Sequence, residues 1–233
     1  MQKIDTFLFD LDGTLVDSVP DLAKALNLML NDYQLPTFDE QTIRHWVGNG
    51  ARMLVERGLR GTSDLKSSDK QGEIDKALEK FLFYYRTLKT KSTVLYEGVH
   101  STLNTLHEKG YSLALVTNKP SEFIDPILSS FSLSSLFSIT IGGDSLSEKK
   151  PSPLPLLHVC KQLGVLPSQC VMVGDSKNDI LAAKAANMQS IGLTYGYNYG
   201  ENIATYNPDW VLNSFSEILK LNPNPQTKES ALL

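Results

Sequence analysis

Short apolar runs that end in polar residues or glycine recur along this chain of 233 residues, and they constrain its fold most. Such runs are too short for helices and are typical of buried strands. They cover residues 7–9, 113–116, 139–141, 170–173, 190–193 and 210–212. From about residue 94 onward they alternate with amphipathic helical patterns. This alternation predicts an α/β fold with a doubly wound parallel sheet, because parallel neighbours are joined by crossover helices.

The stretch from residue 16 to 88 has a different pattern, with no good strand. Leu22, Leu26 and Met29 lie on one helical face, and Gly48-Asn49-Gly50 interrupts a second apolar helix. A polar group at residues 67–69 is a candidate cap for a further long helix. We therefore expect an inserted all-helical domain. The predicted division is core at 1–15, helical domain at 16–88, core at 89–222 and a flexible tail at 223–233.

The composition excludes several classes of protein. A net charge of −4 is unsuited to gripping nucleic acid or resting on anionic lipid. No apolar run approaches the ~18 residues of a membrane helix, and the beginning of the sequence does not resemble a signal peptide. Cys160 and Cys170 lack the spacing of a zinc site and are expected to be buried thiols. A cytoplasmic protein that binds neither nucleic acid nor membranes is expected.

Carboxylates follow the predicted strands. Asp10 and Asp12 follow the first run, Thr117 and Asn118 the second, and Asp175 the fourth. In an open parallel sheet, ligands bind beyond the carboxyl ends of the strands, so these side chains are expected to converge. Three converging carboxylates repel one another unless a cation lies between them. Ligands that are all oxygen atoms favour a hard cation. A small number of protein ligands, completed by water molecules, favours Mg²⁺ over Ca²⁺.

Lys150 and Asp179 complete this set of charged residues. An ammonium beside a metal ion offsets the charge of a bound phosphate group. Taken singly, each motif has an ordinary explanation: Asp12-Gly13 is typical of a turn, Thr117-Asn118 of a helix cap, and Lys150 of a solvated surface. Their joint placement at strand ends favours a site for a phosphate ester.

Four motifs in this order resemble the haloacid dehalogenase superfamily of hydrolases, namely DLDGT at 10–14, TNK at 117–119, KP at 150–151 and GDSKND at 174–179. The insert after the first motif resembles the helical cap of the first cap class in that superfamily. WVGNG at 46–50 and LTYGYNYG at 193–200 are similar to the bacterial phosphoglycolate phosphatase subfamily. The resemblance implies a Rossmann-like core with an inserted cap.

The resemblance also implies residue roles. Asp10 is expected to attack phosphorus, form an aspartyl phosphate and ligate the metal. Asp12 is expected to ligate the metal through its backbone carbonyl, while its side chain acts first as general acid and then as base. Partial burial would favour the protonated form that an acid needs. Asp175 is the third expected metal ligand.

The remaining core residues are expected to hold phosphate or support the site. Thr117 and the backbone N–H of Asn118 would bind phosphoryl oxygens, and Lys150 would offset their charge. Supporting positions are Asp179, which would orient Lys150 or a metal-bound water, Gly13, which permits a sharp turn, and Thr14 and Ser176.

Substrate selection is expected to come from the insert. Gly48, Asn49 and Gly50 would reach over the site, and Arg44 and Arg52 are the cations nearest this loop in sequence. Arginine pairs well with a carboxylate, such as that of phosphoglycolate, so Arg52 is a candidate substrate ligand. The alternative is a helix–helix turn with solvated arginines.

The sequence therefore predicts a Mg²⁺-dependent phosphomonoester hydrolase for a small phosphorylated metabolite, with 2-phosphoglycolate favoured, as a monomer or homodimer. Two alternatives remain open. One is another activity on the same scaffold, such as a sugar-phosphate mutase or a phosphatase for a nucleotide or other small ester. The other is a non-enzymatic phospho-acceptor or binding module, which would leave Asp12 and the helical insert without a purpose.

Overall fold

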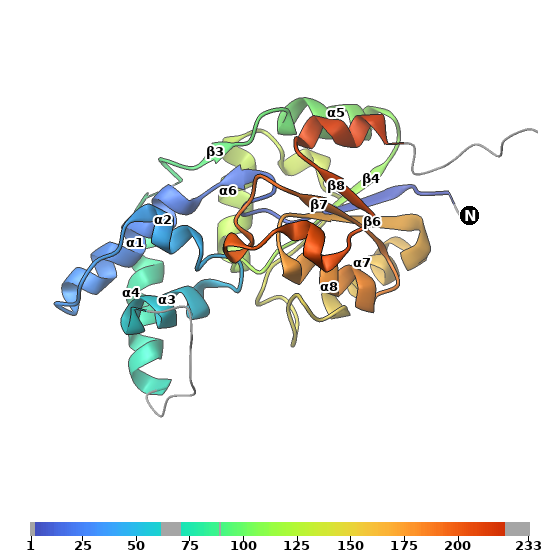
Figure 1. Cartoon of the computed structure of the whole chain (residues 1–233). Coiled ribbons are helices and arrows are strands. Elements are labelled where there is room, and N and C mark those ends of the chain that lie inside the picture. The colour runs from blue at the N-terminus through green and yellow to red at the C-terminus, as the bar shows by residue number, and fades with distance from the viewer. Residues whose placement is uncertain (1–2, 62–70, 89, 222–233) are drawn as a thin grey trace, which may run out of the picture.

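A six-stranded parallel sheet forms the centre of the protein, as seen in a computed structural model that describes residues 3–61, 71–88 and 90–221 (Figure 1). The strands are ordered β5-β4-β1-β6-β7-β8. They comprise β1 (Thr6–Phe9), β4 (Ser112–Val116), β5 (Ile139–Ile141), β6 (Cys170–Gly174), β7 (Gln189–Leu193) and β8 (Trp210–Leu212). All six predicted runs are strands of this sheet. The first strand in the sequence, β1, lies in the middle of the sheet. The strands β4 and β5 then extend the sheet on one side of β1, and β6, β7 and β8 extend it on the other.

Helices cover both faces of the sheet, and the alternation of side chains along each strand explains how. Phe7 and Phe9 of β1 point into one apolar cluster, which includes residues of α5 (Val99–Glu108) and α6 (Ile124–Ser130). Leu8 points into a second cluster, which includes residues of α7 (Leu154–Leu163) and α8 (Lys177–Ala185). Each face therefore buries its own core, and the predicted doubly wound α/β fold is confirmed.

Short 3₁₀ segments connect these elements, namely η1 (Ser121–Phe123), η2 (Ser134–Leu136), η3 (Pro167–Gln169), η4 (Asn198–Gly200), η5 (Ile203–Tyr206) and η6 (Phe215–Lys220). Cys160 and Cys170 are buried free thiols, as predicted, with their sulfur atoms 3.8 Å apart.

In the described part of residues 18–93, four helices project from one side of the sheet (Figure 1). They are α1 (Val19–Asp32), α2 (Glu40–Arg44), α3 (Ala51–Arg60) and α4 (Gln71–Leu88). Helices α1 and α3 both pack against α4. The predicted cap at 67–69 and the predicted tail at 223–233 lie outside the described residues. The exact division into domains stays a prediction.

A two-stranded antiparallel ladder stands where the chain leaves the sheet and returns to it. It pairs β2 (Val16–Asp17) with β3 (Val94–Leu95). The expectation that residues 16–88 contain no strand is corrected at β2, because two residues are too few to show a period of two. The ladder holds both connections of the helical insert side by side.

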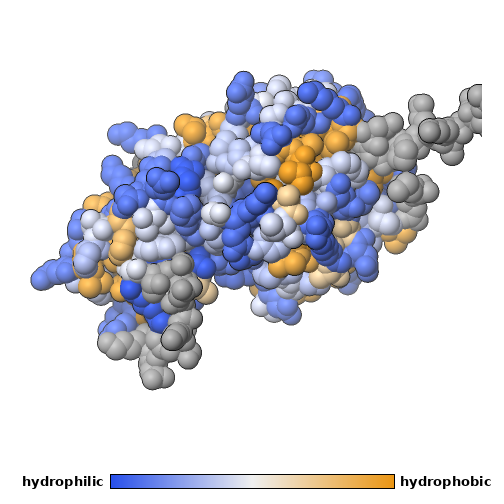
Figure 2. Space-filling view, viewed as in Figure 1, coloured by the Kyte–Doolittle hydropathy of each residue, from blue (hydrophilic) through white to orange (hydrophobic). Residues whose placement is uncertain are grey.

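The surface seen in Figure 2 is largely hydrophilic, with apolar residues in small groups. Among the described parts of the chain, no helix combines the length and apolar character needed to cross a membrane.

Candidate active site

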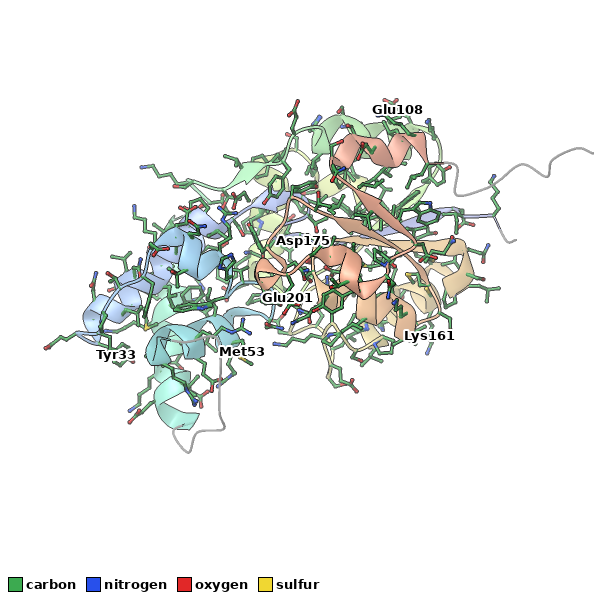
Figure 3. The ribbon with its side chains drawn as sticks, viewed as in Figure 1. Tyr33, Met53, Glu108, Lys161, Asp175 and Glu201 are labelled. Carbon is green, nitrogen blue, oxygen red and sulfur yellow. The ribbon has the colours of Figure 1, made fainter. Side chains whose placement is uncertain are left out.

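Three buried carboxylates meet at the carboxyl ends of the central strands. Asp10 follows β1, and Asp175 follows β6, which pairs with β1. Asp179 lies one helical turn further on, in α8. Each of the three offers an oxygen within 4.8 Å of the others. Figure 3 shows Asp175 at this edge, between the sheet and the projecting helices. The predicted convergence of acids at strand ends is thus seen in the structure.

Burial and mutual repulsion perturb these carboxyl groups. Burial raises the pKa of Asp10 to about 6, although the charge of Lys150 opposes the shift. Burial, followed by the charges of Asp179 and Asp10, raises the pKa of Asp175 well above its usual value. The Oδ1 atom of Asp10 is buried and accepts no hydrogen bond of good geometry. Three buried carboxylates that each offer an oxygen to the same space are hard donors that fit a divalent cation such as Mg²⁺.

Lys150 connects two of the acids. Its buried ammonium donates a hydrogen bond of 2.6 Å to Asp179 and lies 3.0 Å from Oδ1 of Asp10, in an ion pair. Burial opposes its charge, but the two carboxylates outweigh burial and raise the pKa of Lys150. The other oxygen of Asp179 accepts hydrogen bonds from the backbone N–H and the hydroxyl of Ser176. Asp179 therefore fixes Lys150 to the start of α8.

A tight turn after β1 supports Asp175. Gly13 has φ +86°, in the region that favours glycine, and a Cβ at this position would overlap the carboxylate of Asp175. The hydroxyl of Thr14 donates a hydrogen bond of 2.8 Å to Oδ1 of Asp175. The backbone N–H of Tyr197 donates one of 2.7 Å to Oδ2. These contacts fix the orientation of the Asp175 carboxylate, which offers an oxygen to the group formed with Asp10 and Asp179.

Asp12 has a partner that sequence reasoning missed. The buried ammonium of Lys119 donates to both carboxylate oxygens of Asp12, at 3.0 and 3.1 Å, and the Ser18 hydroxyl also donates to this carboxylate. Burial opposes the charge of Lys119, but Asp12 outweighs burial and raises the pKa of Lys119. These donors fix the position of the Asp12 carboxylate beside Asp10. The TNK motif contained this lysine, but gave no signal that its side chain folds back to Asp12.

The end of β4 joins the core to the insert. Thr117 and Asn118 are both buried there. The amide of Asn118 donates to the backbone carbonyls of Gly48 and Lys150, at 3.0 and 2.9 Å. Its Oδ1 atom is buried without a partner. The loop at 48–50 thus lies directly on the strand that carries Thr117.

Further contacts fix the loop of the insert. The carbonyl of Gly48 also accepts a hydrogen bond of 3.1 Å from the side-chain amide of Asn178. The carbonyl of Asn49 accepts one of 2.6 Å from the ammonium of Lys149. The side chain of Asn49 accepts a hydrogen bond of 2.9 Å from Arg57. Gly48 therefore faces the core, whereas the side chain of Asn49 turns away along the insert.

The two predicted arginines have partners elsewhere. Arg52 forms an ion pair with Asp75 of α4, and its side chain is 41% exposed. Arg44 forms ion pairs with Asp17 and Glu40. Neither guanidinium lines the cavity above Asp10.

A cavity of about 30 Å³ lies between the acids and the insert. That volume holds a few water molecules at most. Asp10, Asp12 and Thr117 line its core side, and Leu54 and Phe81 are among the apolar residues that line its insert side. Gly48 and Gly50 of the loop also face this space. A ligand in this space would contact both the core and the insert.

Comparison with known proteins gives consistent matches. The model of the haloacid dehalogenase-like hydrolase family matches residues 7–193. A protein of Colwellia psychrerythraea named phosphoglycolate phosphatase is 52% identical, over 94% of this chain and 97% of its own length. A protein of the same name from Psychrobacter arcticus is 49% identical, over 91% and 93%.

Solved structures agree with this result. The crystal structure of a predicted phosphoglycolate phosphatase from Haemophilus somnus has a TM-score of 0.87 and 42% identity, and covers 94% of this chain and 98% of its own. The predicted resemblance to the superfamily and to these members is confirmed. The chain belongs to the haloacid dehalogenase-like hydrolases, and its relatives group it with the phosphatases of that family.

Proposed function

We propose that this protein is a Mg²⁺-dependent phosphomonoesterase that hydrolyses 2-phosphoglycolate to glycolate and phosphate through an aspartyl phosphate. The observation that carries the proposal is the buried group of Asp10, Asp175 and Asp179, with the ammonium of Lys150 beside it. The choice of substrate is supported by the Colwellia and Psychrobacter relatives, which are named phosphoglycolate phosphatases.

The metal would be held by the carboxylates of Asp10 and Asp175 and by the backbone carbonyl of Asp12. Bound there, Mg²⁺ offsets the negative charge of the phosphate group. Two features of the chain support this set. Oδ1 of Asp10 accepts no hydrogen bond of good geometry, and one oxygen from each of Asp10, Asp175 and Asp179 lies within 4.8 Å of the others.

In the first half of the reaction, a carboxylate oxygen of Asp10 forms a bond to phosphorus while the ester P–O bond breaks. The leaving oxygen of glycolate takes a proton from Asp12, so this carboxyl must be protonated when substrate is bound. The Thr117 hydroxyl and the Asn118 backbone N–H donate to phosphoryl oxygens. Lys150 compensates the charge that gathers on Asp10 and the phosphate.

In the second half, a water molecule attacks phosphorus and gives its proton to Asp12. The bond between phosphorus and Asp10 breaks, which releases inorganic phosphate and restores the free carboxylate. Lys119 and Ser18 hold the carboxylate of Asp12 in place through hydrogen bonds. The same residue thus serves both halves of the reaction.

We infer that residues 16–88 act as a cap over the core of 1–15 and 89–222. The loop at 48–50 closes on the core through Gly48 and Asn49. The cavity beneath the loop has room for only a few water molecules, so the insert must shift for any ester to bind, and it must shift least for a short one. The cytoplasmic location and the monomeric or homodimeric state stay predictions.

The decisive experiment measures phosphate release from a panel of esters with Mg²⁺, with and without a chelator. The panel contains 2-phosphoglycolate, sugar phosphates and nucleotides. We expect Mg²⁺-dependent release, with 2-phosphoglycolate preferred. Asp10→Asn should abolish turnover while the fold is kept. Asp125→Asn, which removes an exposed carboxylate of α6 that lines no part of the site, is the control and should retain full activity.

Two results would contradict the proposal. Near-normal turnover by Asp10→Asn would show that Asp10 is not the nucleophile. Conversion of a sugar phosphate to an isomer without release of phosphate would indicate a mutase instead.

A further inference from the structure

Lys119 and Tyr85 form a polar end of the cavity. Lys119 follows β4 and Tyr85 belongs to α4, so the two side chains meet across the junction of core and insert. The ammonium of Lys119 lies 4.8 Å from the centre of the Tyr85 ring. The side chain of Lys119 is only 2% exposed. The hydroxyl of Tyr85 is buried, interacts electrostatically with Lys119, and makes no hydrogen bond of good geometry. A buried hydroxyl without a partner is costly unless a ligand supplies one.

This end of the cavity has the character of an anion site. Among the described residues that line the cavity, Lys119 is the one cation. Its neighbours on the insert side include Leu22, Leu82 and Phe81, which strengthen electrostatic interactions by excluding water. An ammonium has three N–H donors, and the two oxygens of Asp12 do not exhaust them.

The position of Lys119 matches the geometry of the proposed substrate. The leaving oxygen of 2-phosphoglycolate must face Asp12, which protonates it. One methylene group separates that oxygen from the carboxylate of glycolate. A residue that recognises this carboxylate must therefore lie beside Asp12, and Lys119 contacts Asp12 directly. Arg44 and Arg52 are already paired elsewhere and do not line the cavity.

We propose that Lys119 and Tyr85 bind the carboxylate of the substrate and so make the enzyme selective for acidic two-carbon phosphate esters. This inference rests on the proposed phosphatase function. The ammonium of Lys119 contributes a charge-assisted hydrogen bond, and the hydroxyl of Tyr85 donates a second one. Because Tyr85 comes from α4, the carboxylate site is complete only when the insert lies over the core.

The test compares two substrates of nearly equal size, 2-phosphoglycolate and ethyl phosphate, which has a methyl group in place of the carboxylate. The enzyme is measured as wild type, Tyr85→Phe and Lys119→Met. Tyr84→Phe is the matched control, because the hydroxyl of Tyr84 bonds to Asp32 on the exposed side of α4. Circular dichroism and thermal melts establish that each variant is folded.

We expect the wild type to prefer 2-phosphoglycolate. Tyr85→Phe should lower kcat/KM for 2-phosphoglycolate by about 10-fold or more, mainly through KM, because a hydrogen bond to a charged group is lost. Lys119→Met should lower it by about 30-fold or more, since a buried charged partner disappears. With ethyl phosphate, Tyr85→Phe should stay within about 3-fold of the wild type. Tyr84→Phe should leave kcat/KM for both substrates unchanged.

The outcomes separate this inference from the function on which it rests. If the wild type hydrolyses neither ester, the phosphatase proposal itself fails. If the wild type prefers 2-phosphoglycolate but Tyr85→Phe lowers kcat/KM equally for both substrates, the phosphatase proposal stands and the carboxylate site is refuted. Loss of the preference in Tyr85→Phe, in a folded enzyme that still turns over ethyl phosphate, supports the site. Because Tyr85→Phe removes one oxygen only, it remains decisive even if Lys119→Met does not fold.

Discussion

The turn at Gly13 offers a quantitative test of how the structure positions its metal ligands. Gly13→Ala introduces a Cβ where the backbone has φ +86° and where the carboxylate of Asp175 lies against the chain. Two penalties are therefore expected, one from the backbone and one from the overlap. Gly110 separates them, because it has φ +82° and no atom within 4 Å of an added Cβ.

The magnitude follows from these two sites. Gly110→Ala should lower the free energy of unfolding by about 1–2 kcal/mol, the cost of a left-handed conformation for alanine. Gly13→Ala should lower the free energy of unfolding by the same amount plus about 1–3 kcal/mol for overpacking, which gives about 2–5 kcal/mol in total. For a protein of this size, each kcal/mol corresponds to a shift of about 2–4 °C in Tm.

Urea unfolding and thermal melts measure the two variants, in chelator so that metal binding does not contribute. A magnesium titration of activity then follows. Gly13→Ala should need more Mg²⁺ for half-maximal activity, because the displaced carboxylate of Asp175 ligates the metal poorly, whereas Gly110→Ala should titrate like the wild type. Equal losses of stability in both variants, with equal magnesium requirements, would refute the packing of Asp175 on the turn.

Three further perturbations test other parts of the structure. Lys150→Met should destabilise the protein by about 3–5 kcal/mol in urea unfolding, because it leaves buried carboxylates without their cation. Asp21→Asn should cost about 1–3 kcal/mol by the same measurement and leave KM nearly unchanged, since its carboxylate accepts hydrogen bonds from residues 92–93 and does not itself line the cavity. Asn178→Ala should raise KM more than it lowers kcat in steady-state assays, because it releases the carbonyl of Gly48 and weakens closure of the insert.

The sheet and the acids at its edge could be predicted from local patterns. Short apolar runs identify strands, and a parallel sheet brings their carboxyl ends together, so the convergence of Asp10 with Asp175 follows from the order of the motifs. The strand β2 was not foreseen, because two residues show no periodicity. Its pairing with β3 depends on the path of the chain around four helices.

The partners within the site were harder to predict. Lys119 reaches Asp12 and Tyr85 across long separations in sequence, and no local pattern encodes such contacts. Nearness to the loop in sequence indicated Arg52 as the substrate ligand, but its guanidinium forms an ion pair with Asp75. A helix directs each side chain by its rotation about the axis, so residues beside a loop need not face the same way as the loop.

The central place of β1 has a consequence for how the protein is made. Its neighbours β4 and β6 come much later in the chain, as the pairing of Leu8 with Ala114 and Met172 shows. At a ribosomal rate of roughly 5–20 residues per second, β6 is synthesised roughly 8–30 s after β1. During that interval the aromatic strand that precedes Asp10 has no partner on one edge and depends on the nascent chain or a chaperone for cover. A chain stalled before Cys170 would carry Asp10 but lack Asp175, so it would be released without a metal site.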